Sequence, residues 1–256
     1  MGTIFYSNHN QNSAWHTADI LKKGKLGSKH TFHPLSLKES SVLTNFHSRG
    51  IMIWGSGSEH DWSYFFDYLN KGNRKKIVKV GLDQHLDVNS LCEDSRLNYA
   101  NHMRYSAQRK GHSVRLIIPK KCYAYPPELY DPSLDIKLLP PSKIIETLSD
   151  KRIQLTIDLD CINLFPTEPG YLIINAGFSQ KRFFEIIEIL SKLDIVRLDV
   201  GGIWIPPKEW DFKTNIYGGK SKYRSSFLRR IYSDENIRKA TEIIERIINI
   251  FENLLN

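Results

Sequence analysis

Residues 77–89 read IVKVGLDQHLDVN, an apolar run that ends in two aspartates and a histidine at alternate positions. In a β-strand, residues i, i+2 and i+4 lie on one face. The side chains of Asp83, His85 and Asp87 would therefore point toward one spot where the strand ends. Carboxylate and imidazole groups suit Mn²⁺ and, less exclusively, Zn²⁺, Fe²⁺ or Co²⁺. This stretch predicts a buried strand with a metal site at its carboxyl end.

Two more apolar runs end in groups of the same chemistry. Asp158 and Asp160 follow residues 153–157, and His60 follows residues 51–54 within GSGSEHDW. A D-x-H-x-D pattern by itself also occurs among solvated surface residues, and it is the shared position at strand ends that favours a metal site. Three strand ends with four carboxylates and two imidazoles favour two ions with bridging ligands.

Strand-like and helix-like segments alternate along the chain. Strands are expected at residues 3–6, 51–54, 76–82, 114–118, 136–139, 153–157 and 195–200. Helices are expected at residues 14–23, 59–69, 97–110, 144–148, 179–190 and 234–255. This alternation predicts a three-layer α/β/α fold with a mainly parallel sheet, in which ligands bind at the carboxyl ends of the strands. Without a visible repeat or linker, residues 1–256 are expected to form a single domain.

The composition indicates a protein that is neither secreted nor membrane-bound. Hydrophobic residues make up 41% of the chain, enough for a core, but there is no apolar run of 18 residues. The first residues, MGTIFYSNHNQ, lack the basic start and apolar stretch of a signal peptide. The three cysteines show no CxxC spacing, which fits a reducing compartment. We therefore expect a cytoplasmic protein.

The net charge of +8 is concentrated in one region. Residues 208–230 carry seven Lys and Arg side chains against two acidic ones. Such a stretch can contact phosphates or an anionic substrate, but a solvated basic loop is the commoner explanation. No nucleic-acid partner is expected for this reason. His30 and His33 have no potential co-ligands nearby in the sequence and are expected on the surface.

The order of a histidine, then Asp-x-His-x-Asp, then Asp-x-Asp resembles the ureohydrolases, the family of arginase, agmatinase and formiminoglutamase. The resemblance covers roughly residues 51–200, and the D-x-H-x-D element matches in full. The family's Gly-Gly-Asp-His pattern is replaced here by the looser GSGSEH of residues 55–60. The resemblance implies an arginase-like fold, two divalent ions that are usually manganese, and a homo-oligomer, commonly a trimer or hexamer.

The resemblance also implies a role for each of these side chains. Asp83 and Asp158 would bridge the two ions. The complete ligand set would be His60, Asp83, His85, Asp87, Asp158 and Asp160. A hydroxide between the ions would attack the guanidinium or amidine carbon of a small-molecule substrate. His102, within NYANHMRYSAQRKG, would carry protons to the leaving amine.

The substrate-binding residues depart from the family pattern. Asn89 is similar to an asparagine that arginases use near the amino-acid end of the substrate. The family's late glutamate, which holds the cationic substrate group, falls within LDIVRLDVGG at residues 193–202, where either Arg197 or Asp199 takes its place. Arginine would repel a cationic substrate, so we favour Asp199. Because Arg197 and Asp199 share a strand face, an ion pair between them is the alternative.

The sequence leads to one preferred function and two alternatives. The preferred hypothesis is a dinuclear metal-dependent hydrolase that cleaves a C–N bond in a guanidino, formimino or related linear amidine compound. Arg197 and the basic stretch instead favour a metal-dependent amide hydrolase, resembling deacetylases, on the same fold. The basic stretch also fits a non-catalytic homologue with a nucleic-acid or protein interaction role.

Overall fold

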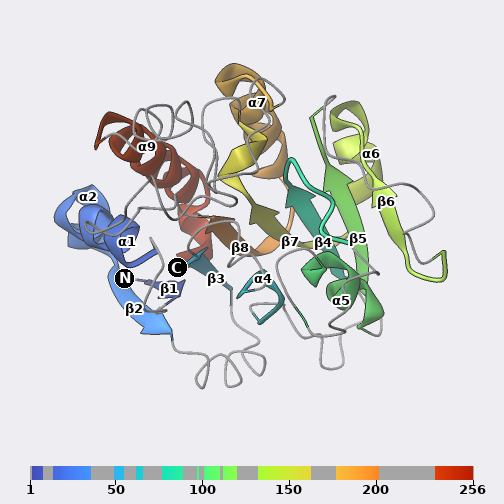
Figure 1. Cartoon of the computed structure of the whole chain (residues 1–256), viewed down its shortest axis with the longest axis horizontal. Coiled ribbons are helices and arrows are strands. Elements are labelled where there is room, and N and C mark those ends of the chain that lie inside the picture. The colour runs from blue at the N-terminus through green and yellow to red at the C-terminus, as the bar shows by residue number, and fades with distance from the viewer. Residues whose placement is uncertain are drawn as a thin grey trace, which may run out of the picture.

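One parallel sheet organises the chain. The computed structural model describes residues 2–7, 14–35, 49–54, 62–65, 77–88, 97, 101–109, 112–119, 132–162, 177–201 and 234–255. Its eight strands run in the order β2-β1-β3-β8-β7-β4-β5-β6, and every neighbouring pair is parallel (Figure 1). They are β1 (Thr3–Ser7), β2 (Thr31–Leu35), β3 (Gly50–Trp54), β4 (Ile77–Leu82), β5 (His112–Ile117), β6 (Ile136–Leu138), β7 (Arg152–Ile157) and β8 (Ile195–Gly201). The predicted parallel α/β fold is confirmed.

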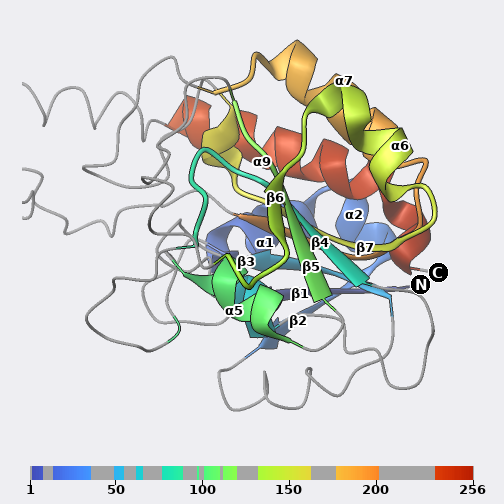
Figure 2. The ribbon, with the colours of Figure 1, turned by 90° about the vertical axis from the view of Figure 1, so that its right-hand side faces the viewer.

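Helices cover both faces of the sheet (Figure 2). One face carries α1 (Ala14–Lys23), α2 (Lys25–Lys29), α6 (Ile144–Leu148), α7 (Gln180–Leu190) and α9 (Asp234–Ile250). The opposite face carries α4 (Trp62–Phe65) and α5 (His102–Gln108). Three single-turn 3-10 helices follow β6, β7 and α9: Pro141–Lys143, Leu159–Cys161 and Glu252–Leu255. Within the described ranges, no helix combines the length and apolar character needed to cross a membrane.

The face under α7 and α9 is mainly apolar. Alternate residues of each central strand point to it, for example Val78, Val80 and Leu82 of β4. The helices contribute matching stripes, such as Ile244 and Ile247 of α9, which are both fully buried. Burial of this large apolar surface is the main source of the fold's stability.

The centre of the opposite face is polar. The register of β4, β7 and β8 places their residues in cross-strand rows, because parallel neighbours keep a fixed alignment. In order along the strands, the rows are Lys79–Gln154–Arg197 and then Gly81–Thr156–Asp199. Two residues further on, just past the strand ends, come Asp83 and Asp158. All of these polar side chains are 0–2% exposed, so the predicted metal residues continue a buried polar strip.

Apolar packing flanks this strip and seats α5. Met103 and Ala107 of α5 pack on Val114 and Leu116 of β5. Gly81 of β4 provides the necessary space, since a Cβ atom there would lie 2.4 Å from Met103 Cε. The close packing holds the first turn of α5 near the carboxyl end of β4.

Some element boundaries differ from the sequence prediction. Within the described residues, α5 is shorter than the helix expected at 97–110, and α4 occupies four of the residues expected to be helical at 59–69. The strand β2 was not predicted, because it contains Pro34 and has exposed residues at Thr31 and His33. The expectation that His30 lies on the surface is wrong: it is 6% exposed and its Nε2 lies 3.1 Å from Glu252 Oε1.

Candidate metal centre

The candidate site lies at one edge of the sheet, where the neighbouring strands β4 and β7 end. Where β4 and β7 end, their chains still run together, and Asp158 donates its backbone N–H to Leu82 O at 2.9 Å. The chain after β7 then turns tightly, and Asp158 Oδ1 accepts the backbone N–H of Asp160 at 3.0 Å. Gln84 N donates in turn to Asp160 Oδ1 at 3.1 Å. These backbone contacts bring the two acidic segments side by side.

Asp83, His85 and Asp160 form a compact cluster at this edge. His85 Nδ1 lies 2.9 Å from Asp160 Oδ2 and 3.4 Å from Asp83 Oδ1. The Asp83 carboxylate is also held by the backbone N–H of His85, at 2.6 Å from Oδ1. The side chains of both aspartates are less than 5% exposed, whereas that of His85 is 23% exposed. The cluster is therefore buried but reachable from solvent on the histidine side.

The charges in the cluster favour an additional positive charge. Burial alone would lower the pKa of His85, but hydrogen bonds to Asp160 and Asp83, together with their negative charges, outweigh it and raise that pKa strongly. Burial raises the pKa of Asp160, and the neighbouring Asp83 carboxylate raises it further. Two carboxylates held this close repel each other unless a cation lies between them, a role that a proton on His85 fills in part.

The donor atoms have the chemistry and spacing that a divalent ion requires. One ligand atom from each of the three residues can be chosen so that all lie within 4.8 Å of one another. Donors on opposite sides of an ion bound at about 2.2 Å lie about 4.4 Å apart, so shifts of a few tenths of an ångström suffice. Two carboxylates and one imidazole suit manganese or a similar metal. The neighbouring thiol of Cys161 does not fit as a ligand, because burial and Asp160 raise its pKa.

The predicted ligand Asp87 and the predicted proton carrier His102 lie next to each other. His102 Nε2 is 2.9 Å from Asp87 Oδ2, and the side chains are 0% and 8% exposed. Asp87 has a φ of 51°, an uncommon left-handed conformation for a residue other than glycine. Such conformations concentrate at functional sites. The structure thus pairs two predicted site residues that are fifteen positions apart in the chain.

Asp199 is fully buried and accepts three side-chain hydrogen bonds. Its Oδ1 accepts Trp54 Nε1 at 3.0 Å and the hydroxyl of Thr156, and its Oδ2 accepts Ser63 Oγ at 3.1 Å. Arg197 lies two residues earlier on the same face and is 1% exposed. Sequence analysis did not find Trp54, Ser63 or Thr156, because none belongs to a motif and their convergence depends on strand order.

Other predicted features lie outside the described residues. These are the ligand His60, the substrate residue Asn89 and the basic stretch 208–230. Asp87 and Asp158 are described but are not among the three clustered donors, and the side chain of Asp158 accepts the backbone N–H of Asp160.

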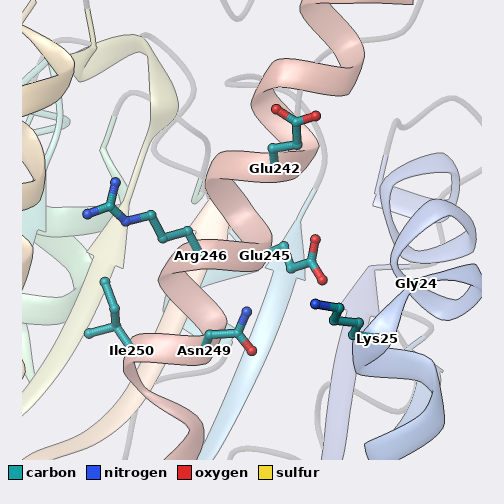
Figure 3. A pocket seen from close by; sticks show the side chains of 7 residues that line it. All are labelled: Gly24, Lys25, Glu242, Glu245, Arg246, Asn249 and Ile250. Carbon is teal, nitrogen blue, oxygen red and sulfur yellow. The ribbon is translucent and has the colours of Figure 1, made fainter.

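A separate hollow of about 640 Å³ lies between α2 and α9, and none of the clustered acidic residues lines it. Figure 3 shows Lys25 and Glu245 facing each other across it. Its other charged groups have partners as well: Glu242 pairs with Arg238 at 2.9 Å, and Arg246 stacks on Phe184 at 3.6 Å. The mixture of exposed ion pairs is typical of a solvated groove between helices, and the acidic cluster remains the better candidate site.

Comparison with known structures identifies the fold. The chain superposes on a putative agmatinase from Clostridium difficile with a TM-score of 0.66 and 13% identity, covering 100% of this chain and 98% of that one. An arginase from Bacillus subtilis gives a TM-score of 0.62 and 12% identity, with the same coverage. A formimidoylglutamase from Bacillus subtilis gives 0.55 and 10%, covering 81% and 80%.

Comparisons that use overall sequence similarity do not detect this relationship. No protein-family profile matches the chain, and no curated protein matches it. The similarity lies in the order of strands and helices rather than in overall identity. The predicted resemblance is confirmed at this level: the chain has the arginase-like α/β fold that these agmatinase, arginase and formimidoylglutamase structures share.

Proposed function

We propose that this protein is a divergent ureohydrolase, a metal-dependent hydrolase that cleaves a C–N bond in a guanidino, formimino or related linear amidine compound. The observation that carries the proposal is the convergence of Asp83, His85 and Asp160 at the carboxyl edge of an arginase-like sheet. When bound, divalent ions lower the pKa of water and so supply a strong nucleophile near neutral pH.

Different residues would bind the metal ions, transfer protons and contact the substrate. Asp83, His85, Asp158 and Asp160 would hold one ion, and Asp83 and Asp158 would both be shared with a second ion. Asp87 and His60 would complete the second position. His102, held against Asp87 at 2.9 Å, would move protons toward the leaving nitrogen. Asn89 and either Asp199 or Arg197 remain the proposed substrate contacts.

Further parts of the proposal are manganese as the metal, a homotrimer or homohexamer, a cytoplasmic location and a small-molecule substrate without a nucleic-acid partner. The donor set supports manganese over softer metals, because two of its three members are carboxylates. The single sheet formed by strands from residues 3–201 supports one domain for the whole chain.

Metal content and product release test the proposal. The protein would be loaded with Mn²⁺ and dialysed, and its bound metal measured. Urea release would then be assayed with arginine, agmatine and guanidinobutyrate, and formamide or ammonia release with formiminoglutamate. We expect bound manganese and release from at least one compound, with both lost in Asp160→Asn. A wild-type protein that binds no divalent ion would refute the proposal.

Buried cations on the polar face support a second candidate, a metal-dependent amide hydrolase. Lys79 and Arg197 are 0% and 1% exposed and occupy the same cross-strand row. Their positive charges disfavour a cationic guanidino group nearby and favour a neutral or anionic substrate. Acetate release from N-acetylated amines, without urea, formamide or ammonia release from the four compounds above, would identify this activity.

A further inference from the structure

The buried carboxylate of Asp199 connects three parts of the chain that are separate in sequence. Trp54 is the last residue of β3, Ser63 belongs to α4, and Thr156 lies near the end of β7. All three donate hydrogen bonds to this one carboxylate. Because all three donors and Asp199 itself are 0% exposed, solvent does not compete for these bonds.

The packing around Trp54 shows that the arrangement is specific. A Cβ atom at Gly201 would lie 2.4 Å from Trp54 Cη2 and 2.8 Å from two further ring atoms. The indole therefore lies directly against the backbone of β8, two residues beyond Asp199. Glycine at this position lets the indole reach across, and the carboxylate fixes its N–H.

A second contact secures Ser63 from the neighbouring strand. Gln154 of β7 donates from Nε2 to Ser63 O at 3.4 Å. The next residue in α4, Tyr64, accepts a hydrogen bond from Arg109 at its carbonyl and lies under the Arg109 guanidinium at 4.0 Å. The start of α4 is thus fixed both to the sheet and to the end of α5.

We propose that Asp199 is a positioning residue for the metal site. Its carboxylate fixes the end of β3 and the start of α4, which bracket the stretch containing His60 in the sequence. It also fixes Thr156, which lies two residues before Asp158 in β7. Groups that hold metal-binding segments in place from behind the ligands raise the affinity for the ion without contacting it. The inference rests on the proposed function, since it concerns the metal site named there.

This role differs from that of a substrate anchor in what it requires of the side chain. An anchor for a cationic group requires the negative charge, whereas positioning requires the hydrogen-bond acceptors. In Asp199→Asn, the amide oxygen still accepts from Trp54 and Thr156, and the Ser63 hydroxyl can accept from the amide nitrogen. Asp199→Ala removes every acceptor. The two variants therefore separate the two roles.

The test measures the affinity and number of bound Mn²⁺ ions in the purified full chain by titration calorimetry. Each variant is used at a temperature where circular dichroism shows it folded. We expect Asp199→Ala to weaken Mn²⁺ binding about 10–100-fold, as for other groups that orient metal ligands. Asp199→Asn should stay within about fivefold of wild type. Asp194→Asn, at the opposite end of β8 and paired with Arg49, is the matched control and should bind as wild type does.

A second variant covers the case in which Asp199→Ala does not fold. Trp54→Phe with Ser63→Ala removes two of the three donors and leaves Asp199 in place. We expect about a tenfold loss of Mn²⁺ affinity in this double variant. Wild-type affinity in either Asp199→Ala or the double variant would overturn the inference, and so would an Asp199→Asn variant as weak as Asp199→Ala. If the wild-type chain itself bound no Mn²⁺, the proposed function would fail instead.

Discussion

His102 Nε2 lies 2.9 Å from Asp87 Oδ2, while the backbone N–H of the next residue, Met103, donates to the Asp87 carbonyl oxygen at 3.1 Å. Both the side-chain carboxylate and the backbone carbonyl of Asp87 therefore contact the first turn of α5. The residue adopts a φ of 51°, which aspartate tolerates better than most side chains. The contacts with α5 are what hold Asp87 in this strained conformation.

Substitutions at Asp87 should distinguish the effect of its hydrogen bond with His102 from the effect of its negative charge. In metal-free protein, Asp87→Ala should lower the free energy of unfolding by about 1–3 kcal/mol, since it removes a buried acceptor from His102 and suits a positive φ poorly. Asp87→Asn keeps an acceptor and tolerates the same φ, so it should cost less than about 1 kcal/mol. Urea denaturation in the presence of a chelator measures both. Equal losses would contradict this account.

The same pair of variants bears on metal binding. If Asp87 is a ligand as proposed, Asp87→Asn should bind Mn²⁺ at least about tenfold more weakly despite its retained stability, because the neutral amide is a poorer ligand. Calorimetric titration checks the affinity. Unchanged binding would remove Asp87 from the ligand set and leave it as a partner of His102 only.

Loss of a clustered ligand should abolish tight binding. We expect Asp160→Asn and His85→Ala to weaken Mn²⁺ binding more than about 100-fold, beyond the effect of groups that only orient ligands. Asp150→Asn is the control, because Asp150 has a side chain that is 72% exposed and pairs with Lys151. Metal analysis after dialysis measures the outcome. A fully loaded Asp160→Asn protein would show that the cluster is not the site.

Manganese binding should release protons near neutral pH. Asp160 and Asp83 raise the pKa of His85 in the metal-free protein, so its imidazole is protonated at pH 7. A metal binds only the neutral ring, so binding must displace that proton, and affinity should fall as the pH is lowered. Titrations in two buffers with different ionisation enthalpies give the number of protons released. We expect about one proton per ion at this cluster, and no release would contradict the charge state.

Two glycines on the polar face should differ in their tolerance of alanine. At Gly81 the added Cβ meets the flexible end of Met103, so we expect Gly81→Ala to cost about 1 kcal/mol. At Gly201 it meets three atoms of the rigid Trp54 ring within 2.8 Å, so the cost should reach about 3 kcal/mol. Urea denaturation compares them. Adding Trp54→Phe to Gly201→Ala should recover part of the loss if the indole is the obstacle.

The sequence predicted the strand ends well because their signal is local. An apolar run followed by alternating acidic residues places Asp83 and Asp160 at strand ends whatever the rest of the fold does. Parallel strands then bring such ends to one edge, so the clustering followed from a single further assumption. The start of the helix expected at residues 179–190 also has a local signal, because serine is a favoured N-cap and Ser179 Oγ accepts the backbone N–H of Arg182.

Contacts across the sheet could not be predicted in the same way. Trp54, Ser63 and Thr156 reach Asp199 only because β3 and β7 lie on either side of β8. No local sequence pattern indicates this order of strands. The burial of His30 was missed for a related reason: its partners, Gly2 and Glu252, lie near opposite ends of the chain. The spacing of residues shows which side chains share a face of one strand. The order of the strands determines which side chains of different strands come into contact.

The alignment of polar residues in rows limits how the length of this protein can change. Inserting or deleting one residue inside β4, β7 or β8 would rotate every later side chain of that strand to the other side of the sheet. Val80 or Leu155 would then lie among charged groups, and an aspartate would enter the hydrophobic core beneath α9. Length variation in related genes should therefore be confined to the connections, with these three strands kept at constant length.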